Sequence, residues 1–361
     1  MTVQLTREQA RRIVVRAQLL DDPLAGDVVE VADQLGYIKI DPTSVIAPAE
    51  HTMLFSRVGR VYEPGHLTKA TEDDRMLAEF GGTFRPMDMI PLMLAEARRW
   101  LAKRNRNDWI EANGVFRDGV LARLRADGPL LAKAIPDTAV EALPDVDGWY
   151  SSNQVPRMLE ALQLRGEVAV SAREGRQRVW DLAERVYPQN LPTYDEAQAQ
   201  RLLAERRLRA AGIAKQSSPW SQVEKAGLEA SVEGSKWTWR VDPGALERLD
   251  ETFRPRCVFL SPYDSMLFDR PRLKELFEFE YVLEQFKPKP QRKFGYFAHP
   301  ILLGDRFIGQ LDAEVDWKRM LLRVNAIHEV VPFTDDERDL VDAEIAELAA
   351  WLEVDLPGAE R

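Results

Sequence analysis

The stretch EVAVSAREGRQRVW, residues 167–180, decides how the fold of this chain is interpreted. Apolar residues alternate at its start, residues 173–175 have the composition of a turn, and the chain returns through QRVW. This pattern predicts a β-hairpin. Because Arg173, Arg176 and Arg178 lie on the hairpin, we expect it to be a basic wing.

Three helical patterns precede the hairpin within the region 114–188. The first ends at Gly128, the second is short and covers residues 130–134, and the third ends at Gly166. Three helices followed by a hairpin is the order of a winged-helix module, and a helical scaffold with an incidental hairpin is the alternative. A similar order follows Pro192, so the two regions look like tandem copies of one architecture.

The N-terminal part of the chain is typical of the start of a helix-turn-helix module. Thr6 and Gln9 have the spacing of a capping box before a first helix. A second helix is predicted over residues 27–35, and Gly36 follows it where a helix C-cap favours glycine. Residues 37–40 are predicted to form a strand.

Strand-like runs replace helices from Pro255 onward. We predict them at residues 257–260, 294–297, 307–311 and 320–324. Their spacing suggests a small antiparallel β-barrel or sheet. A closing amphipathic helix over about 334–352 is expected to pack on it through apolar residues, namely Leu340, Ile345, Leu348 and Trp351.

Length and composition indicate a globular chain with several modules. With 361 residues, 45% hydrophobic and 30% charged, about two to four modules are expected. The sequence has no apolar run of the roughly eighteen residues that a membrane span needs, and its start lacks the layout of a signal peptide. Cys257 is the lone cysteine, so no internal disulfide is expected. We therefore expect a cytoplasmic protein.

The charge of the chain argues mildly against a nucleic-acid partner, because the formal net charge is −10. The local distribution matters more than the total. Basic residues gather in separate clusters, among them the predicted wing and residues 287–293. A solvated helix face is the alternative explanation of each such cluster.

Several familiar catalytic and cofactor motifs are absent from the sequence. It contains no glycine-rich dinucleotide motif, no P-loop and no Gly-x-Ser-x-Gly elbow. The four histidines are far apart in sequence, and none pairs with another at metal-ligand spacing. We therefore expect no metal site and no cofactor.

The strongest candidate for chemistry is the segment Lys39-Ile40-Asp41-Pro42. In an extended segment, Lys39 and Asp41 point to the same face while Ile40 turns into the core. A carboxylate at that position is suited to hold a water molecule and to oppose the positive charge of an oxocarbenium-like sugar. The alternative is that Asp41 makes a local turn bond before proline.

Four groups of motifs occur in the order that one known family has. They are LGYIKIDP (35–42) with VIA (45–47) and LFSRVG (54–59); the hairpin EVAV through QRVWDL (167–182); LSPYD (260–264) with FDR (268–270); and GYF (295–297) with LGDR (303–306). These stretches resemble the crosslink-repair DNA glycosylases of the AlkZ/YcaQ type. The similarity spans nearly the whole chain, which is identified as a divergent member of this winged-helix DNA-binding family.

The resemblance implies an α+β fold arranged around duplex DNA. It consists of three tandem winged-helix modules, a small antiparallel β-barrel and a C-terminal helix. The predicted domains are an N-terminal winged-helix-like module with the candidate active-site motif (1–113), a second winged-helix module (114–190), a third (191–250), and a β-barrel-like domain with its closing helix (251–361).

The resemblance also implies monofunctional hydrolysis of the N-glycosidic bond of alkylated purines, with unhooking of interstrand crosslinks in some members. The family's catalytic triplet is glutamine–apolar–glutamine or glutamine–apolar–aspartate. It falls on residues 39–41, where Asp41 matches and Lys39 departs. Family members often carry arginine and histidine where this chain has Pro48 and Glu50, with a histidine one place later.

We predict a DNA repair glycosylase with Asp41 and Lys39 as candidate catalytic residues. The expected partner is double-stranded DNA containing alkylated or crosslinked bases, bound by a nucleoid-associated monomer. DNA contacts are expected at six basic residues, namely Arg57, Arg173, Arg176, Arg178, Lys236 and Arg240. A winged-helix DNA-binding protein without catalysis and a protein-interaction scaffold are the alternatives.

Overall fold

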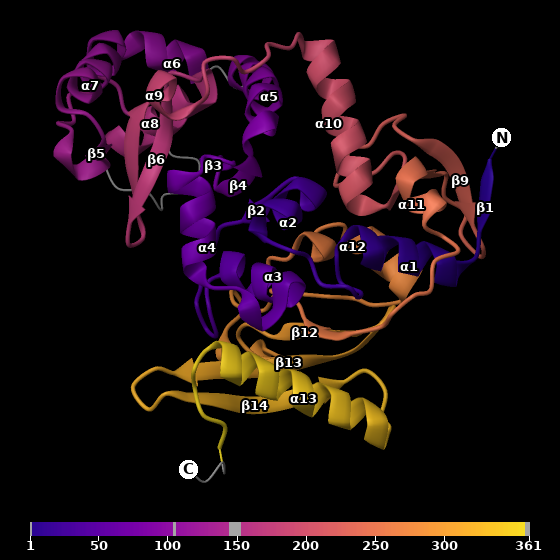
Figure 1. Ribbon diagram of the computed structural model, residues 1–361. Helices are drawn as coiled ribbons and strands as arrows, with labels where there is room; N and C mark the ends of the chain where they lie inside the picture. Colours follow the sequence, from indigo (N-terminus) through magenta and orange to yellow (C-terminus); the bar gives the residue numbers. More distant parts are fainter. Residues whose placement is uncertain (1, 104–105, 144–152, 358–361) are drawn as a thin grey trace. The chain divides into compact units, whose positions relative to one another are not determined.

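The computed structural model has an α+β fold and describes residues 2–103, 106–143 and 153–357 (Figure 1). The chain divides into two compact units. Unit 1 consists of Met1–His66 and Ala204–Arg361, and unit 2 consists of Leu67–Leu203. The division differs from the predicted boundaries after residues 113, 190 and 250, because the N-terminal elements fold with the C-terminal part of the chain.

The first two helices of unit 1 are those that the sequence predicts. Helix α1 (Arg7–Ala17) begins after Thr6, and the side chains of Thr6 and Gln9 make the reciprocal bonds of a capping box. Helix α2 (Val28–Leu35) ends at Gly36, whose φ of 74° lies in the left-handed region that favours glycine. Local capping interactions therefore set the start of α1 and the end of α2.

The predicted strand over residues 37–40 is shorter in the structure. Strand β2 covers Ile38–Lys39, and the chain leaves the strand at Ile40. Ile38 is fully buried, whereas Ile40 is partly exposed. The prediction that Ile40 turns into the core is wrong, because Ile38 occupies that place. The elements that follow are α3 (Ala49–Val58), the 3-10 turn η1 (Gly59–Val61) and α4 (Pro64–Thr68).

A four-stranded sheet in unit 1 brings the N-terminus to the segment that follows α10 (Glu196–Ala211). Its order is β1 (Val3–Leu5), β9 (Leu228–Val232), β10 (Trp239–Val241) and β8 (Ile213–Lys215). Strand β1 runs parallel to β9, and the other two pairs are antiparallel. Ile13 of α1 shares one hydrophobic core with Trp239. The order of helices and hairpin predicted after Pro192 includes the hairpin of β9 and β10, and the N-terminal strand completes its sheet.

The C-terminal strands form an open sheet and not the predicted barrel. In the described residues the order is β11 (Cys257–Phe259), β12 (His299–Leu303), β13 (Arg306–Asp316) and β14 (Leu321–Glu329), antiparallel throughout. Val258, Leu302 and Phe307 pack in the same core as α1 and α12 (Arg270–Phe277). Because helices cover these apolar side chains, the sheet does not need to close on itself.

Two details of the C-terminal prediction change. Strand β12 was not predicted, and residues 294–297 are irregular. The closing helix α13 (Asp335–Trp351) is confirmed, with a capping box at Thr334. Leu340 was expected to face the sheet but is 47% exposed, and the neighbouring Val341 is buried instead.

Unit 2 contains the first and third of the helices predicted between residues 114 and 188, and also the predicted hairpin. Its α-helices are α5 (Ile90–Lys103), α6 (Arg106–Ala112), α7 (Gly114–Asp127), α8 (Val155–Arg165) and α9 (Ala183–Val186). Strands β6 (Val168–Glu174) and β7 (Gln177–Leu182) form the hairpin. Of the short helix predicted over 130–134, only the second half is helical, as the 3-10 turn η4 (Ala132–Ala134). Leu130–Leu131 instead forms strand β5 on the edge of β7.

The core of this region joins the helices to the hairpin. Phe116 and Leu124 of α7, Leu159 of α8 and Trp180 of β7 are buried in one cluster. A second hairpin, β3 (Leu77–Phe80) with β4 (Thr83–Pro86), precedes α5. In the described part of the chain, no helix has both the length and the apolar character that crossing a membrane requires.

Candidate active site

Asp41 lies at the start of the loop between β2 and α3, and its side chain is partly exposed. Its Oδ1 accepts a hydrogen bond from the backbone N–H of Thr43 at 2.9 Å. Its own backbone N–H donates to Oε2 of Glu50 at 3.2 Å. The local turn bond considered from the sequence is therefore present, and it engages Oδ1 of the carboxyl group.

Glu50 places a second carboxyl group beside Asp41. It is the second residue of α3, where the N-terminus of a helix favours negative charge. Like Asp41, it is partly exposed. Two acidic groups in this arrangement can orient a water molecule and stabilise a cation that forms next to them.

His51 is the next residue of α3 and is largely buried. Its Nδ1 lies 2.7 Å from the hydroxyl of Tyr62. Burial lowers the pKa of His51 to about 4. Burial, together with the negative charge of Glu50, raises the pKa of Tyr62. Both side chains are uncharged near neutral pH, so the negative charge at this end of α3 comes from Glu50.

Tyr263 comes from a distant part of unit 1 and meets the Asp41 loop. Its hydroxyl accepts a hydrogen bond from Nε2 of Gln285 at 2.6 Å. Thr43 and Asp41 are its other hydrogen-bonding neighbours. Burial, reinforced by the negative charge of Asp41, raises the pKa of Tyr263. The phenol therefore keeps its proton and can donate a hydrogen bond to the Asp41 carboxylate.

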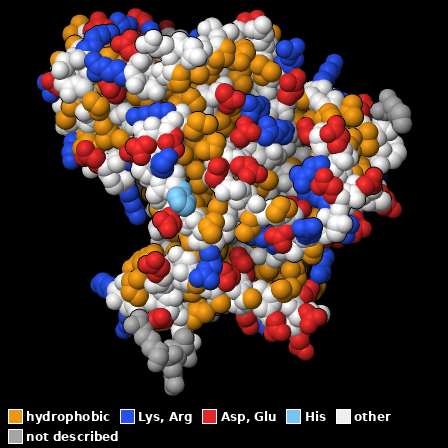
Figure 2. Space-filling model, in the orientation of Figure 1, with side chains coloured by type: hydrophobic (Ala, Val, Ile, Leu, Met, Phe, Trp, Pro, Cys, Tyr) orange, Lys and Arg blue, Asp and Glu red, His pale blue; other side chains and the backbone are white. Residues whose placement is uncertain are grey.

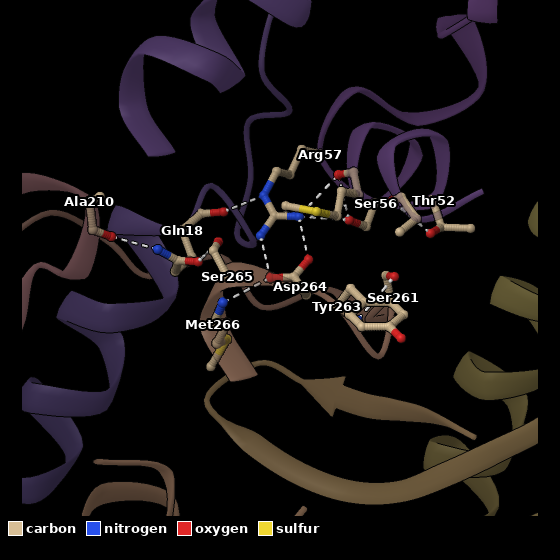
Figure 3. A network of polar contacts seen from close by, with 12 residues as sticks. Gln18, Thr52, Ser56, Arg57, Ala210, Ser261, Tyr263, Asp264, Ser265 and Met266 are labelled. Atoms are coloured by element: carbon tan, nitrogen blue, oxygen red, sulfur yellow. Dashed lines mark hydrogen bonds and ion pairs between the residues drawn. The ribbon is translucent and has the colours of Figure 1, made fainter. Parts of the chain in front are cut away.

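A fully buried ion pair ties the segment that carries Tyr263 to α3. Nη1 and Nη2 of Arg57 bond the two carboxylate oxygens of Asp264 at 2.8 and 2.9 Å (Figure 3). Arg57 also donates to the backbone carbonyls of Gln18 and Met53. We predicted Arg57 as a DNA contact, but its side chain is 0% exposed. That prediction is corrected: Arg57 holds the site together from inside.

Lys39 occupies the first position of the motif. It is the last residue of β2, two positions before Asp41, and its side chain is partly exposed. The side chain therefore brings a positive charge to the edge of the site. Its role in catalysis stays a prediction.

The arginines of the predicted wing do not all face solvent. Nε of Arg173 and Nε of Arg178 donate to the two carboxylate oxygens of Glu79, at 2.7 and 2.5 Å. Glu79 belongs to β3 and is only 4% exposed. Both guanidinium groups are therefore engaged inside unit 2, whereas Arg176 is exposed in the turn between β6 and β7.

Arg240 and Lys236 of the β9–β10 hairpin differ in the same way. Arg240 donates to the backbone carbonyls of Lys225 and Ala226, each at 2.7 Å. It is partly buried, so it stabilises the loop before β9. Lys236 is exposed in the connection between the two strands. Of these two predicted DNA contacts, Lys236 is the one with an exposed side chain.

No group of three or more His, Cys, Asp or Glu side chains that could hold a metal ion occurs among the described residues. Figure 2 shows acidic and basic side chains interspersed on the face that it draws. Contacts with a nucleic acid must therefore be argued residue by residue.

Sequence reasoning missed most of the side chains around Asp41. Glu50 had been noted only as a departure from the family pattern. Tyr263 stood within the stretch LSPYD, which was used for the resemblance but given no role. Gln285 carried no signal at all, because its bond to Tyr263 depends on the packing of an irregular loop.

Comparisons with known proteins agree with the resemblance drawn from the sequence. The family model described as "DNA glycosylase AlkZ-like" matches residues 32–351. Among solved structures, the Streptomyces sahachiroi DNA glycosylase AlkZ is similar, with a TM-score of 0.60 and 17% sequence identity. The similarity covers 98% of this chain and 98% of that chain. At this identity the structural likeness establishes a shared fold.

Proposed function

Because this chain belongs to the AlkZ-like DNA glycosylase family, we propose that it hydrolyses the N-glycosidic bond of alkylated purines in double-stranded DNA. Water attacks the sugar carbon, the damaged base leaves, and an abasic site remains. The observation that carries the proposal is the Asp41 carboxyl group, which is partly exposed and has the Glu50 carboxyl group beside it.

The chemistry of the leaving group explains why so few residues suffice. An N7-alkylated purine already carries a positive charge, so its departure needs no general acid. As the bond lengthens, positive charge develops on the sugar ring, where the Asp41 carboxylate stabilises it. The same carboxylate orients the attacking water, while the backbone N–H of Thr43 holds its Oδ1 and the Tyr263 hydroxyl lies next to it.

Lys39 has a supporting part in this proposal. Its ammonium group anchors a phosphate that flanks the lesion, through a charge-assisted hydrogen bond that a glutamine amide makes more weakly. Unhooking of an interstrand crosslink requires the same bond to be broken at one of the two joined bases. We therefore include crosslinked purines in the proposed substrate class.

The proposed DNA-binding scaffold is a set of three winged-helix modules. Helices α7 and α8 with the β6–β7 hairpin support one module, and the sheet containing β8, β9 and β10 supports another. The third is proposed around α2, β2 and α3, next to the candidate catalytic residues.

A second candidate is a DNA-binding protein without catalysis. It is favoured by the turn bond between Asp41 and Thr43, which gives the carboxylate a purely structural role, and by the lysine in the altered triplet. The two candidates differ in base release and agree in DNA binding.

The deciding experiment incubates the purified protein with a duplex that contains one N7-methylguanine and measures the released base. We expect Asp41→Asn to lower the rate by ~10²–10⁴-fold while DNA affinity holds. Asp250→Asn is the matched control, because Asp250 is exposed and makes no contact used in the proposal. Equal release by wild type and Asp41→Asn would remove Asp41 from the mechanism. DNA binding without release would favour the second candidate.

A further inference from the structure

Part of the connection between α12 and β12, residues 285–296, is rich in basic and aromatic residues. Between Gln285 and Phe294 the sequence has four basic residues and no acidic one, in a chain of formal net charge −10. Aromatic side chains stand on both sides of the basic ones. We call residues 285–296 the basic-aromatic loop; its members in order are Phe286, Lys287, Lys289, Arg292, Lys293, Phe294 and Tyr296.

A buried carboxylate closes the base of this loop. Glu284 is 4% exposed, and its Oε2 accepts hydrogen bonds from the backbone N–H groups of Lys293 and Phe294 at 2.7 and 2.8 Å. Its Oε1 accepts a bond from Nζ of Lys287 at 2.7 Å. Burial raises the pKa of Glu284, but these donors outweigh burial, and the pKa lies below its ordinary value. The two ends of the loop are thus held together.

Internal bonds also fix the shape of the loop. Nε of Arg292 donates to the backbone carbonyl of Lys287 at 2.9 Å. A short 3-10 turn, η6 (Lys289–Gln291), forms the outer part. Because these bonds already order the loop, it loses little conformational entropy when a partner binds.

The loop presents both aromatic and basic side chains at its surface. Phe286 is 86% exposed and Tyr296 is 44% exposed. Lys289 and Lys293 are exposed as well. Cations flanked by aromatic rings fit a nucleic acid, because the cations bind phosphates and the rings stack on bases.

The position of the loop relates it to the candidate active site. Gln285, its first residue, donates to the Tyr263 hydroxyl, and that hydroxyl neighbours Asp41. DNA whose lesion sits at Asp41 therefore passes within reach of the loop. A lipid surface also attracts cations and aromatic rings, but this connection favours DNA.

We propose that the basic-aromatic loop binds the DNA duplex beside the lesion. Lys289 and Lys293 contact phosphates, and Phe286 stacks on a nucleotide adjoining the damaged one. The inference rests on the proposed function, because it assumes that duplex DNA reaches Asp41. It adds a binding element that lies outside the predicted wings.

The test compares Phe286→Ala and the double variant Lys289→Ala/Lys293→Ala with wild type. Both leave the bonds of Glu284 intact, because Lys293 contributes only its backbone N–H and Lys289 makes no bond to Glu284. The matched control is Lys225→Ala/Arg254→Ala, which removes the same charge at exposed positions elsewhere in unit 1. Affinity for a duplex with or without N7-methylguanine is measured by fluorescence anisotropy over a range of salt concentrations.

We expect the lysine double variant to bind about tenfold more weakly and to lower the slope of log affinity against log salt by about two units. Phe286→Ala should weaken binding by about tenfold with an unchanged slope, because stacking releases no counterions. The control should match wild type. Thermal unfolding midpoints should be the same for all variants, since every altered side chain is exposed.

Loop variants with wild-type affinity and slope would overturn the proposal, and so would a control that loses as much as the lysine variant. Binding to anionic phospholipid vesicles that is lost in Phe286→Ala, with DNA binding unchanged, would also overturn it and indicate a membrane surface. Base release by wild type is measured separately. If wild type releases the base but the loop variants bind DNA normally, only the proposal for the loop is refuted. If DNA binding depends on the loop but no base is released, only the proposed catalysis is refuted.

Discussion

Glu79 in unit 2 and Glu284 in unit 1 are both buried carboxylates next to basic segments. They differ in how many basic side chains of the segment remain exposed. Glu79 accepts hydrogen bonds from the side chains of Arg173 and Arg178, so two charges of the predicted wing are engaged inside the unit. Glu284 accepts from one lysine side chain and two backbone N–H groups, so the side chains of Lys289 and Lys293 stay exposed. A DNA-binding surface therefore depends on which atoms the buried carboxylate takes and not on how many basic residues the segment contains.

Removing an arginine that bonds to Glu79 should have the largest effect on stability. Arg178→Ala leaves the buried carboxylate without one of its two cations, so the free energy of unfolding should fall by about 2 to 4 kcal/mol. Urea denaturation followed by circular dichroism measures it. Adding Glu79→Gln to Arg178→Ala should recover part of the loss, because it removes the uncompensated charge. No recovery would mean that the arginine acts through packing.

Glu284→Gln tests the other half of the comparison and should have a smaller effect. The neutral amide of glutamine has one acceptor oxygen and no negative charge, so it cannot satisfy all three donors. The free energy of unfolding should therefore fall by about 1 to 3 kcal/mol. DNA affinity should fall with it, because the exposed lysines lose their fixed positions. Unfolding measurements and anisotropy on the same samples check both; a stable variant with normal affinity would contradict the role given to Glu284.

The pH dependence of stability provides an independent check on Glu284. Its folded-state pKa lies below the ordinary value of 4.5. Its contribution is therefore fully present above the unfolded-state pKa and is lost as the pH falls from about 4.5 through the folded-state pKa. Wild type should lose more stability than Glu284→Gln over this window, measured as urea midpoints at successive pH values.

Lys39 and Asp41 provide a third case of a basic residue near a carboxylate, this time at the candidate active site and partly exposed. Lys39→Gln restores the family triplet, so we expect base release at or above the wild-type rate. Borohydride should trap no covalent adduct with DNA, because the proposed reaction is hydrolysis by water and forms no Schiff base. A trapped adduct that disappears in Lys39→Gln would indicate lyase chemistry.

The smallest effect is expected at Arg176, which the carboxylate of Glu79 does not hold. Arg176→Ala should change the free energy of unfolding by less than about 0.5 kcal/mol. If this side chain touches a phosphate, the salt slope of DNA binding should fall by about one unit. An unchanged slope would mean that the turn of the hairpin is solvated.

Features with strong local signals were predicted correctly. The capping box of Thr6 and Gln9, the glycine end of α2 and the β6–β7 hairpin all depend on residues within a few positions of one another. The pairing of β1 with β9 could not be predicted, because a three-residue strand finds its partner more than two hundred residues away. Closure of the C-terminal sheet depends on which helices cover it, and the strand pattern does not contain that information.

The candidate site shows the same limit at the level of side chains. The resemblance identified the position of Asp41, and its catalytic role stays a prediction. Tyr263 and Gln285 reach it through bonds across long separations in sequence. Arg57 and Arg240 count as basic residues in any sequence analysis, but buried acceptors engage their guanidinium groups. Because backbone carbonyls are among these acceptors and carry no sequence pattern, composition overstated the basic surface.

The division of the chain has a consequence for the order of events during synthesis. Unit 2 is one continuous segment, whereas unit 1 is made from the two segments on either side of it. On the ribosome, the N-terminal segment with Asp41 emerges first, but β9, Tyr263 and Asp264 follow only after all of unit 2. Unit 2 can fold as soon as it emerges, since domains generally fold as units. A nascent chain that stops before residue 257 lacks Tyr263 and the Arg57–Asp264 ion pair, so the surroundings of Asp41 are completed only when the second segment of unit 1 has been made.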